Sequence, residues 1–153
     1  MKAETIYFIG RWFYNHGFKF VARLFEALNY LLHISHIPSS AEIGKGTKFV
    51  YRGISVVIHA RAKIGKNCII GQCVTIGGKS GSYEVPIIGN NVYIGPGARI
   101  IGNIVIGDNS IIGANAVVVK DVPPYSVVGG GTSKGYSIYN ERELAKQVLW
   151  LWG

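Results

Sequence analysis

The chain has 153 residues, of which 48% are hydrophobic and 16% are charged, and it carries a formal net charge of +8 at pH 7. This length fits a single domain, and the apolar fraction excludes a wholly disordered chain. The 21 glycines follow no Gly-X-Y period, which excludes collagen and indicates many tight turns. The positive charge leaves three kinds of anionic partner open: a phosphorylated cofactor, an anionic polymer and a membrane surface.

Residues 1–36 have the spacing of amphipathic helices, and we expect one or two helices with a break near residues 15–17. Charged side chains interrupt the apolar run, so the segment is not predicted to span a bilayer, and no cleavable signal is recognised. We expect it to cap the open first coil of the fold that follows, with attachment to an anionic bilayer as the alternative. The apolar residues that recur at helical spacing are Phe20, Val21, Leu24, Phe25, Leu28, Leu31 and Leu32.

A repeat of six residues runs through residues 37–134, with Gly common at the second position and a small residue common at the fifth. A helix of 3.6 residues per turn cannot keep this repeat on one face, and a plain strand has a period of two. A chain that turns a corner every six residues can keep the repeat on one face. Three such sides close one coil of a mainly β fold, a parallel β-helix. The aliphatic first position falls at residues 58, 64, 70, 76, 88, 94, 100, 106, 112 and 118, and an earlier copy at Ile43 is three residues out of phase.

The remaining residues complete the domain plan. Residues 141–153 are predicted to form a short C-terminal helix, so the chain divides into a helical segment (1–36), the β-helix (37–134) and a tail (135–153). A β-sandwich fits less well, because its strands recur at a spacing of about 8–12 residues. Cys68 and Cys73 form neither a disulfide framework nor a zinc site, which indicates a cytoplasmic protein with reduced cysteines.

His59 is the histidine that lies on the repeat, since the other three lie in or beside the helical segment. It occupies a corner position where the repeat normally has Gly, so its side chain should point outward. We expect residues with little side chain to be stacked above it, in a column about 14 Å long at the strand spacing of about 4.8 Å. Steps of one coil, or three repeats, place this column at Gly77, Gly95 and Gly113, and place Gly78, Pro96 and Ala114 beside it.

Two stretches are specific enough to indicate a family. Residues 72–78, QCVTIGG, resemble the Q-x-V-T-[LI]-G-G run of serine acetyltransferases, and residues 94–124, IGPGARIIGNIVIGDNSIIGANAVVVKDVPP, resemble the cofactor-binding coils of that branch. Over residues 37–134 the chain is therefore similar to the hexapeptide-repeat acetyltransferases. The resemblance implies a left-handed parallel β-helix, a homotrimer, acetyl-CoA as the co-substrate and no metal.

The resemblance also implies a set of cofactor contacts. Pro96 and Ala114 match positions that touch the cofactor through backbone atoms, and Val119 and Lys120 match a second contact. Lys134 stands where a basic residue often meets a phosphate. The column above His59 would then hold the pantetheine arm, with the two lysines beyond its far end near the nucleotide phosphates.

Three features differ from serine acetyltransferases. Where these enzymes carry an Asp-His pair this chain has Tyr51 and Arg52, and where they carry Arg-His-Pro it has residues 84–86, EVP. Residues 1–36 are also too short for their N-terminal helical domain. Residues 53–59, GISVVIH, resemble the acetyltransferases of polysaccharide gene clusters. We therefore expect O-acetylation of a sugar of a surface polysaccharide, with serine as the alternative acceptor and amino-sugar N-acetylation as a third.

Acetyl transfer to a hydroxyl needs a base for the hydroxyl proton and donors for the oxyanion. We predict that His59 is this base, that the hydroxyl attacks acetyl-CoA directly without an acyl-enzyme, and that a backbone N–H of the Gly77–Gly78 turn is the donor. Glu84 lies in the loop of residues 79–86 that interrupts the repeat, where it either orients the imidazole, contacts the acceptor or is simply solvated. Further acceptor-side candidates are Tyr51, Arg52 and Tyr83.

Other functions fit less well. A metal-dependent hydratase of the same fold needs three histidine ligands, and only His59 lies on the repeats. A non-catalytic scaffold or ice-binding surface would show a regular ladder of exposed Thr, and Thr is sparse in this sequence. Nucleic-acid binding is supported by the net positive charge alone and would require a basic stripe interleaved with aromatic residues. The expected partners are acetyl-CoA, a small or saccharide acceptor and further copies of this chain, in the cytoplasm or peripherally at the inner face of the membrane.

Overall fold

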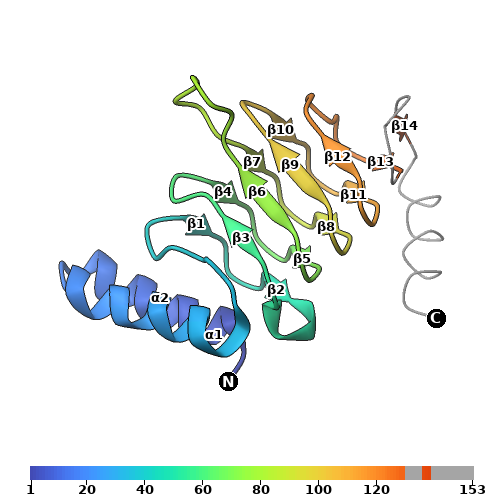
Figure 1. Cartoon of the computed structure of the whole chain (residues 1–153). Coiled ribbons are helices and arrows are strands. Elements are labelled where there is room, and N and C mark those ends of the chain that lie inside the picture. The colour runs from blue at the N-terminus through green and yellow to red at the C-terminus, as the bar shows by residue number, and fades with distance from the viewer. Residues whose placement is uncertain (130–135, 139–153) are drawn as a thin grey trace.

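The structure is a computed structural model that describes residues 1–129 and 136–138. Two helices, α1 (Ala3–Asn15) and α2 (Lys19–His33), open the chain and are separated by a short turn. A β-helix of short strands follows and extends away from the helices (Figure 1). The predicted helical start and its break near residues 15–17 are thus confirmed. The helix predicted at residues 141–153 lies outside the described residues.

The strands form the three faces of a triangular coil. Face 1 contains β3 (Val57–Ile58), β6 (Thr75–Gly77), β9 (Arg99–Ile101) and β12 (Val117–Val118). Face 2 contains β1 (Glu42–Ile43), β4 (Lys63–Ile64), β7 (Ile87–Ile88) and β10 (Val105–Ile106). Face 3 contains β2 (Lys48–Phe49), β5 (Ile69–Ile70), β8 (Tyr93–Ile94), β11 (Ile111–Ile112), β13 (Ser126–Val128) and β14 (Tyr136–Ile138). Strands stack in parallel within each face, and β14 adds to β13 in the antiparallel direction.

Three corners join these faces, and we name each corner after one of its residues. The His59 corner joins face 1 to face 2 through residues 59–62, 78–86, 102–104 and 119–122. The Asn91 corner joins face 2 to face 3 through residues 44–47, 65–68, 89–92 and 107–110. The Pro96 corner joins face 3 to face 1 through residues 50–56, 71–74, 95–98 and 113–116.

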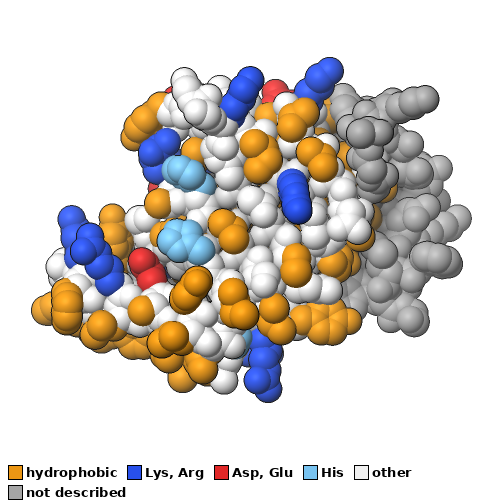
Figure 2. Space-filling view, viewed as in Figure 1, with side chains coloured by type: hydrophobic (Ala, Val, Ile, Leu, Met, Phe, Trp, Pro, Cys, Tyr) orange, Lys and Arg blue, Asp and Glu red, His pale blue; other side chains and the backbone are white. Residues whose placement is uncertain are grey.

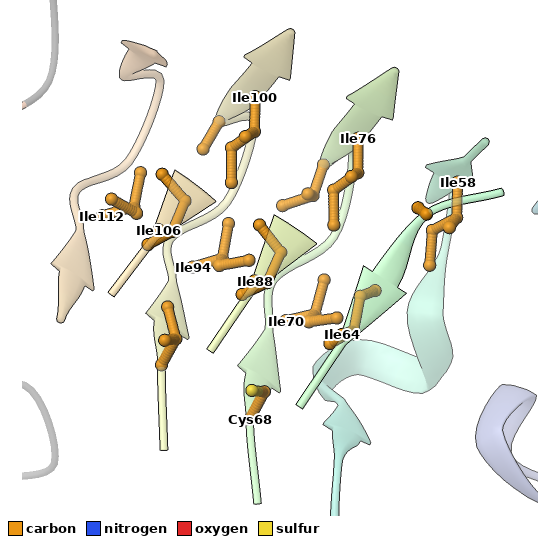
Figure 3. Close-up of a cluster of buried hydrophobic side chains, with 14 of the residues drawn as sticks. Ile58, Ile64, Cys68, Ile70, Ile76, Ile88, Ile94, Ile100, Ile106 and Ile112 are labelled. Atoms are coloured by element: carbon orange, nitrogen blue, oxygen red, sulfur yellow. The ribbon is translucent and has the colours of Figure 1, made fainter. Parts of the chain in front are cut away.

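Stacked isoleucines fill the interior of the coil (Figure 3). Full burial of one such side chain contributes about 1.5–3 kcal/mol relative to leaving it exposed. Small residues of the fifth repeat position, such as Ala62, Cys68 and Ala98, are buried beside them. The two predicted columns are therefore confirmed, and the aliphatic column consists of Ile58, Ile76 and Ile100 on face 1, Ile64, Ile88 and Ile106 on face 2, and Ile70, Ile94 and Ile112 on face 3.

The step between stacked residues is not constant along the chain. Ile58 pairs with Ile76, three repeats later, but Ile76 pairs with Ile100, four repeats later. The loop of residues 79–86 supplies the additional repeat length. The first copy of the repeat is out of phase because the 3₁₀ turn η1 (Val50–Gly53) lengthens the first coil by three residues.

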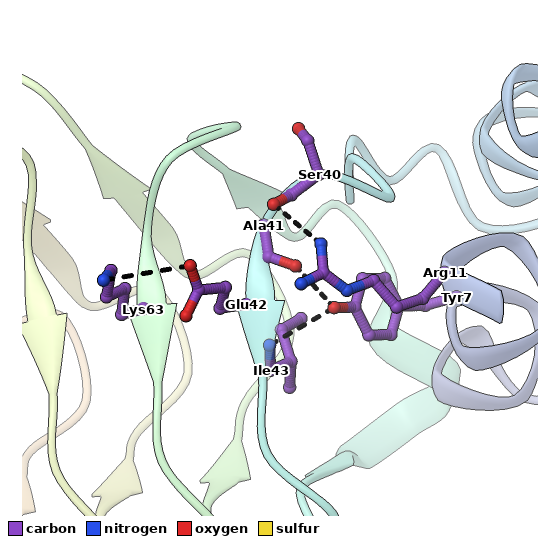
Figure 4. Close-up of polar contacts among 7 residues, drawn as sticks. All are labelled: Tyr7, Arg11, Ser40, Ala41, Glu42, Ile43 and Lys63. Atoms are coloured by element: carbon purple, nitrogen blue, oxygen red, sulfur yellow. Dashed lines mark hydrogen bonds and ion pairs between the residues drawn. The ribbon is translucent and has the colours of Figure 1, made fainter. Parts of the chain in front are cut away.

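Helix α1 covers the open end of the first coil (Figure 4). The Tyr7 hydroxyl donates to the carbonyl oxygen of Ala41 at 2.6 Å and accepts from the N–H of Ile43 at 3.2 Å. These backbone groups lie at the free edge of β1, so Tyr7 takes the place of a missing neighbouring strand. Burial raises the pKa of Tyr7 to about 12, although the nearby Arg11 opposes the shift. Helix α1 therefore caps the β-helix, as expected.

Candidate functional site

His59 follows β3 directly and begins the turn to β4. Its N–H donates to the carbonyl oxygen of Ile76 at 2.8 Å, and its carbonyl accepts from the N–H of Ala62 at 2.9 Å, which closes the turn. The preceding Ile58 is fully buried, whereas His59 is half-buried. The predicted outward position of the imidazole is therefore confirmed.

The two edges of the His59 ring have different neighbours. On one edge, Nδ1 accepts a hydrogen bond from the N–H of Arg61 at 3.2 Å, so the neutral ring carries its proton on Nε2. The other edge faces Gly78: a Cβ built on this glycine would lie 3.7 Å from Cδ2 and 3.8 Å from Nε2 of His59. His59 therefore separates a space beside Arg61 from a space beside Gly78.

The loop of residues 79–86 leaves the His59 corner after Gly78 and returns to it at Pro86, whose carbonyl accepts from the N–H of Lys63. Its Val85 side chain is only 9% exposed, and Val85 Cγ1 would lie 3.4 Å from a Cβ on Gly78. The end of the loop thus folds back onto the glycine that faces the imidazole.

A cleft of about 400 Å³ lies between this loop, the first two coils and α1. The guanidinium of Arg61 stacks 4.0 Å from the centre of the Tyr83 ring and donates to the Tyr83 carbonyl, which fixes the loop over the cleft. Because Ala60 and Arg61 belong to its wall, the cleft opens beside His59. The lining residues are Tyr14, Ser40, Glu42, Ala60, Arg61, Lys63, Tyr83, Glu84, Val85 and Ile87.

Glu84 lies in the wall of this cleft and is exposed. In the described part of the chain its carboxylate makes no hydrogen bond or ion pair, and the contact to His59 Nδ1 comes from the backbone of Arg61. The structure thus gives no support to the prediction that Glu84 orients the imidazole. A role for Glu84 in contacting the acceptor stays a prediction.

The predicted column above His59 is wrong in its upper part. Gly77 does lie above His59, but it pairs with Ile101, and Gly102 donates to the Gly77 carbonyl at 3.0 Å. The error arises because uniform steps of three repeats ignore the length that the 79–86 loop adds to this coil. The column beside His59 therefore continues from Gly78 to Gly102 and then to the exposed Lys120.

Gly95, Pro96 and Ala114 lie on the Pro96 corner instead of above His59. Gly71, Gly95 and Ala114 are in close contact there, since a Cβ on Gly71 would lie 2.6 Å from the Pro96 nitrogen and a Cβ on Gly95 would lie 2.5 Å from the Ala114 nitrogen. The other predicted cofactor residues within the described ranges do not lie on the Pro96 corner. Val119 and Lys120 share the His59 corner and are exposed, whereas Lys134 lies outside the described residues.

Sequence reasoning missed the contributions of Gly102, Tyr14 and the Arg61–Tyr83 pair. Counting sides of the triangle in place of residues would have found Gly102, because the aliphatic position skips from 76 to 88 across the loop. Tyr14 joins the cleft only through the packing of α1, for which the sequence has no local signal.

Neither cysteine lies at the His59 corner. Cys68 is fully buried, and burial raises the pKa of its thiol. Cys73 is exposed on the Pro96 corner with a φ of 58°, and its repeat partners there are Gly97 and Asn115. Uniform steps of three repeats would have placed Asn91 and Asn109 beside Cys73, an error with the same cause as the predicted column above His59.

Comparison with known proteins relates this geometry to a family. Residues 86–120 match the family model for the bacterial transferase hexapeptide (six repeats). The chain is 40% identical over 131 residues to a serine acetyltransferase of Synechococcus elongatus, covering 84% of this chain and 53% of that protein. It is 36% identical over 136 residues to a serine acetyltransferase of Helicobacter pylori, covering 88% of this chain and 79% of that protein.

A solved structure shares the fold as well. The crystal structure of serine acetyltransferase from Brucella abortus in complex with coenzyme A superposes with a TM-score of 0.80 at 30% identity, covering 86% of this chain and 53% of that chain. The chain thus spans about half the length of the Synechococcus and Brucella proteins but most of the Helicobacter one. With its left-handed β-helix and its hexapeptide repeats, the chain belongs to the serine acetyltransferase family.

Proposed function

We propose that this protein transfers the acetyl group of acetyl-CoA to a hydroxyl group by direct attack at the His59 corner. The observation that carries the proposal is the position of the imidazole between two spaces. Nδ1 lies toward Arg61 and the cleft, and Nε2 lies toward Gly78 and the column of small residues. The Gly78 side suits the thioester, and the cleft suits the body of an acceptor whose hydroxyl reaches the thioester carbon beside Nε2.

One ring nitrogen must serve both reactants, because the attacking oxygen and the departing sulfur are bonded to the same carbon of the intermediate. Nε2 faces Gly78 and the thioester, so we assign the base to Nε2, in the tautomer that carries its proton on Nδ1 once the contact with the Arg61 N–H opens. Nε2 takes the hydroxyl proton as the oxygen attacks the thioester carbon, and it gives this proton to the sulfur as the C–S bond breaks. The ring ends in its starting tautomer, and the products are the acetyl ester and the free thiol of coenzyme A.

Gly78 supports the same chemistry through its backbone. Its N–H has no hydrogen-bond partner within the described ranges, and the residue lies against the imidazole. An N–H of this kind, held by a turn, is the type of donor that stabilises the oxyanion of an acyl-transfer intermediate. We assign this role to Gly78.

The coenzyme A site is supported by the relatives and by the open column. The Brucella serine acetyltransferase was solved in complex with coenzyme A. In this chain, the column of Gly78 and Gly102 beside His59 has no bulky side chain and ends at Lys120, whereas the column directly above His59 continues from Gly77 to Ile101 and Val119. We propose that the pantetheine arm follows this column toward Lys120, with Lys134 as a further phosphate contact.

We further propose a homotrimer in which the Pro96 corner of one copy faces the His59 corner of the next. Gly95, Pro96 and Ala114 would then form the second wall of the coenzyme A site. Exposed aliphatic residues on the outer surfaces of the strands support the burial of these faces, among them Val57, Ile87, Val105 and Val117, each 42–47% exposed. Light scattering should give about three times the 16.6 kDa of the chain, and a value near 16.6 kDa would contradict the trimer.

Serine is the acceptor that the relatives favour, in preference to the sugar expected from the sequence. A sugar hydroxyl is the second candidate, because Tyr51 and Arg52 replace the Asp-His pair and Glu84 and Val85 replace Arg-His of serine acetyltransferases. The cleft also offers two tyrosines, Tyr14 and Tyr83, among several polar groups.

The two cysteines of the chain are unpaired, and we therefore propose a cytoplasmic location for the protein.

The test is an acetyltransferase assay on the purified protein with acetyl-CoA, in which free thiol release is followed with L-serine, with a panel of sugars and with no acceptor. Serine-dependent release supports the family activity, and sugar-dependent release supports the second candidate. Thiol release that no hydroxyl compound accelerates would contradict the proposed reaction.

A further inference from the structure

Helix α2 is apolar on the side that faces away from the β-helix. Ala22 and Asn29 are buried on its inner side, while Phe20, Leu24 and Leu31 are 75%, 55% and 77% exposed. These three residues follow a spacing of four and seven, so they form one stripe opposite the buried side. An ordinary surface helix carries polar residues at such positions, so this stripe lacks a structural role in the single chain.

Helix α1 repeats the pattern. Its inner side buries Ala3, Ile6, Tyr7 and Gly10 against the first coil and α2. Its outer side forms a shallow apolar hollow, and Figure 2 shows hydrophobic side chains gathered along this end of the molecule. The lining residues of the hollow are Thr5, Phe8, Ile9 and Trp12.

The charges around these two outer sides have one sign. Lys2, Lys19 and Arg23 are exposed. The two acidic residues of the helices point elsewhere: Glu26 accepts a hydrogen bond from the N–H of Ser39 at 2.7 Å, and Oε2 of Glu4 is buried. The outer surface of the helical hairpin is thus apolar with a cationic border.

We propose that the outer surface of α1 and α2 docks on an anionic membrane surface, with both helices lying flat in the interface. Phe, Leu and Trp on one side with Lys and Arg at the border is the pattern of helices that bind in this way. No helix within residues 1–129 has the length and hydropathy to cross a bilayer. A lipid surface fits better than a second copy of the chain, because a two-fold contact through this surface would bring Lys19 and Arg23 toward the same cations of the partner.

The test is flotation of the full chain with vesicles of phosphatidylcholine alone and of phosphatidylcholine mixed with phosphatidylglycerol, at low and high salt. The protein should float with the mixed vesicles, and neutral vesicles or high salt should weaken binding about tenfold or more. The Leu24→Ser/Leu31→Ser variant should also lose about tenfold or more, while keeping its helical circular dichroism because both side chains are exposed. Leu24→Ile/Leu31→Ile, which keeps the stripe apolar, is the matched control and should bind like the wild type.

Trp12 gives a direct measure of depth. In a Trp150→Phe/Trp152→Phe background it is the single tryptophan, and its emission should shift to the blue on addition of mixed vesicles. Absence of flotation with mixed vesicles, or binding that the leucine variant leaves unchanged, would overturn the proposal. If neither the wild type nor the leucine variant binds vesicles, and the variant has a smaller mass by light scattering than the wild type, the stripe would instead be a contact between copies.

Discussion

The Asn91 corner and the His59 corner are built from the same repeat but are packed in different ways. At the Asn91 corner, Asn67, Asn91 and Asn109 each adopt a left-handed conformation, and the Asn91 side chain donates to that of Asn109 at 3.1 Å. Coil follows coil without interruption, and side chains satisfy the turn N–H groups. At the His59 corner an imidazole replaces the usual glycine, and the 79–86 loop interrupts the stack.

The glycines show the difference most clearly. At the Asn91 corner a Cβ on Gly65 would lie 2.4 Å from the Gly89 carbonyl oxygen, and one on Gly107 would lie 2.3 Å from the Pro124 nitrogen. At the His59 corner, a Cβ on Gly78 would meet nothing closer than 3.4 Å, and Gly78 does not have a positive φ. The fold needs the first kind of glycine, whereas Gly78 leaves space that the fold does not use. We therefore attribute Gly78 to ligand binding.

The largest effect is expected at the catalytic base. His59→Ala should lower kcat by about 10²–10⁴, because it removes the group that takes the hydroxyl proton. Acetyl-CoA affinity should change little, since the column beside His59 is intact. Turnover and affinity are measured separately, with Cys73→Ala as a control that should behave like the wild type. Near-normal turnover in the His59 variant would contradict the role of His59 as the base. An inactive Cys73 variant with trapped acetyl-enzyme would instead place the chemistry at the Pro96 corner.

At the Asn91 corner the expected loss is one of stability. Gly65→Ala should lower the free energy of unfolding by about 1–3 kcal/mol or more, because its Cβ meets backbone atoms of Gly89 that can move only if the coils separate. Denaturant unfolding measures the change. An alanine variant as stable as the wild type would show that this corner is no more closely packed than the other.

The capped end of the β-helix should respond to the loss of one hydroxyl. Tyr7→Phe leaves the Ala41 carbonyl and the Ile43 N–H without their partner, at a cost of about 1–3 kcal/mol. The pKa of Tyr7 is raised to about 12, so its contribution is complete below about pH 10 and is lost as the pH rises from there toward 12. The stability difference between wild type and variant should therefore shrink above pH 10. Tyr30→Phe, at an exposed position of α2, is the matched control and should show neither effect.

The sequence predicts the fold well because one column of aliphatic residues and one column of small residues set the coil. It also places His59 outward, since the preceding Ile58 must be buried. It fails where the spatial neighbour depends on an insertion: Gly95 and Pro96 were assigned to the wrong corner because the loop lengthens one step from three repeats to four. Contacts such as Tyr14 at the cleft depend on how a helix packs, and no local pattern encodes them.

The most direct test of the difference between the corners is Gly78→Ala, compared with Gly65→Ala. The new methyl group makes ordinary contacts with the protein, so the free energy of unfolding should stay within about 0.5 kcal/mol of the wild type. It would, however, lie 3.8 Å from His59 Nε2, in the space assigned to the thioester, so turnover with acetyl-CoA should fall about tenfold or more. A stable Gly78→Ala protein with wild-type turnover and wild-type acetyl-CoA affinity would contradict the assignment of the His59 corner as the catalytic site.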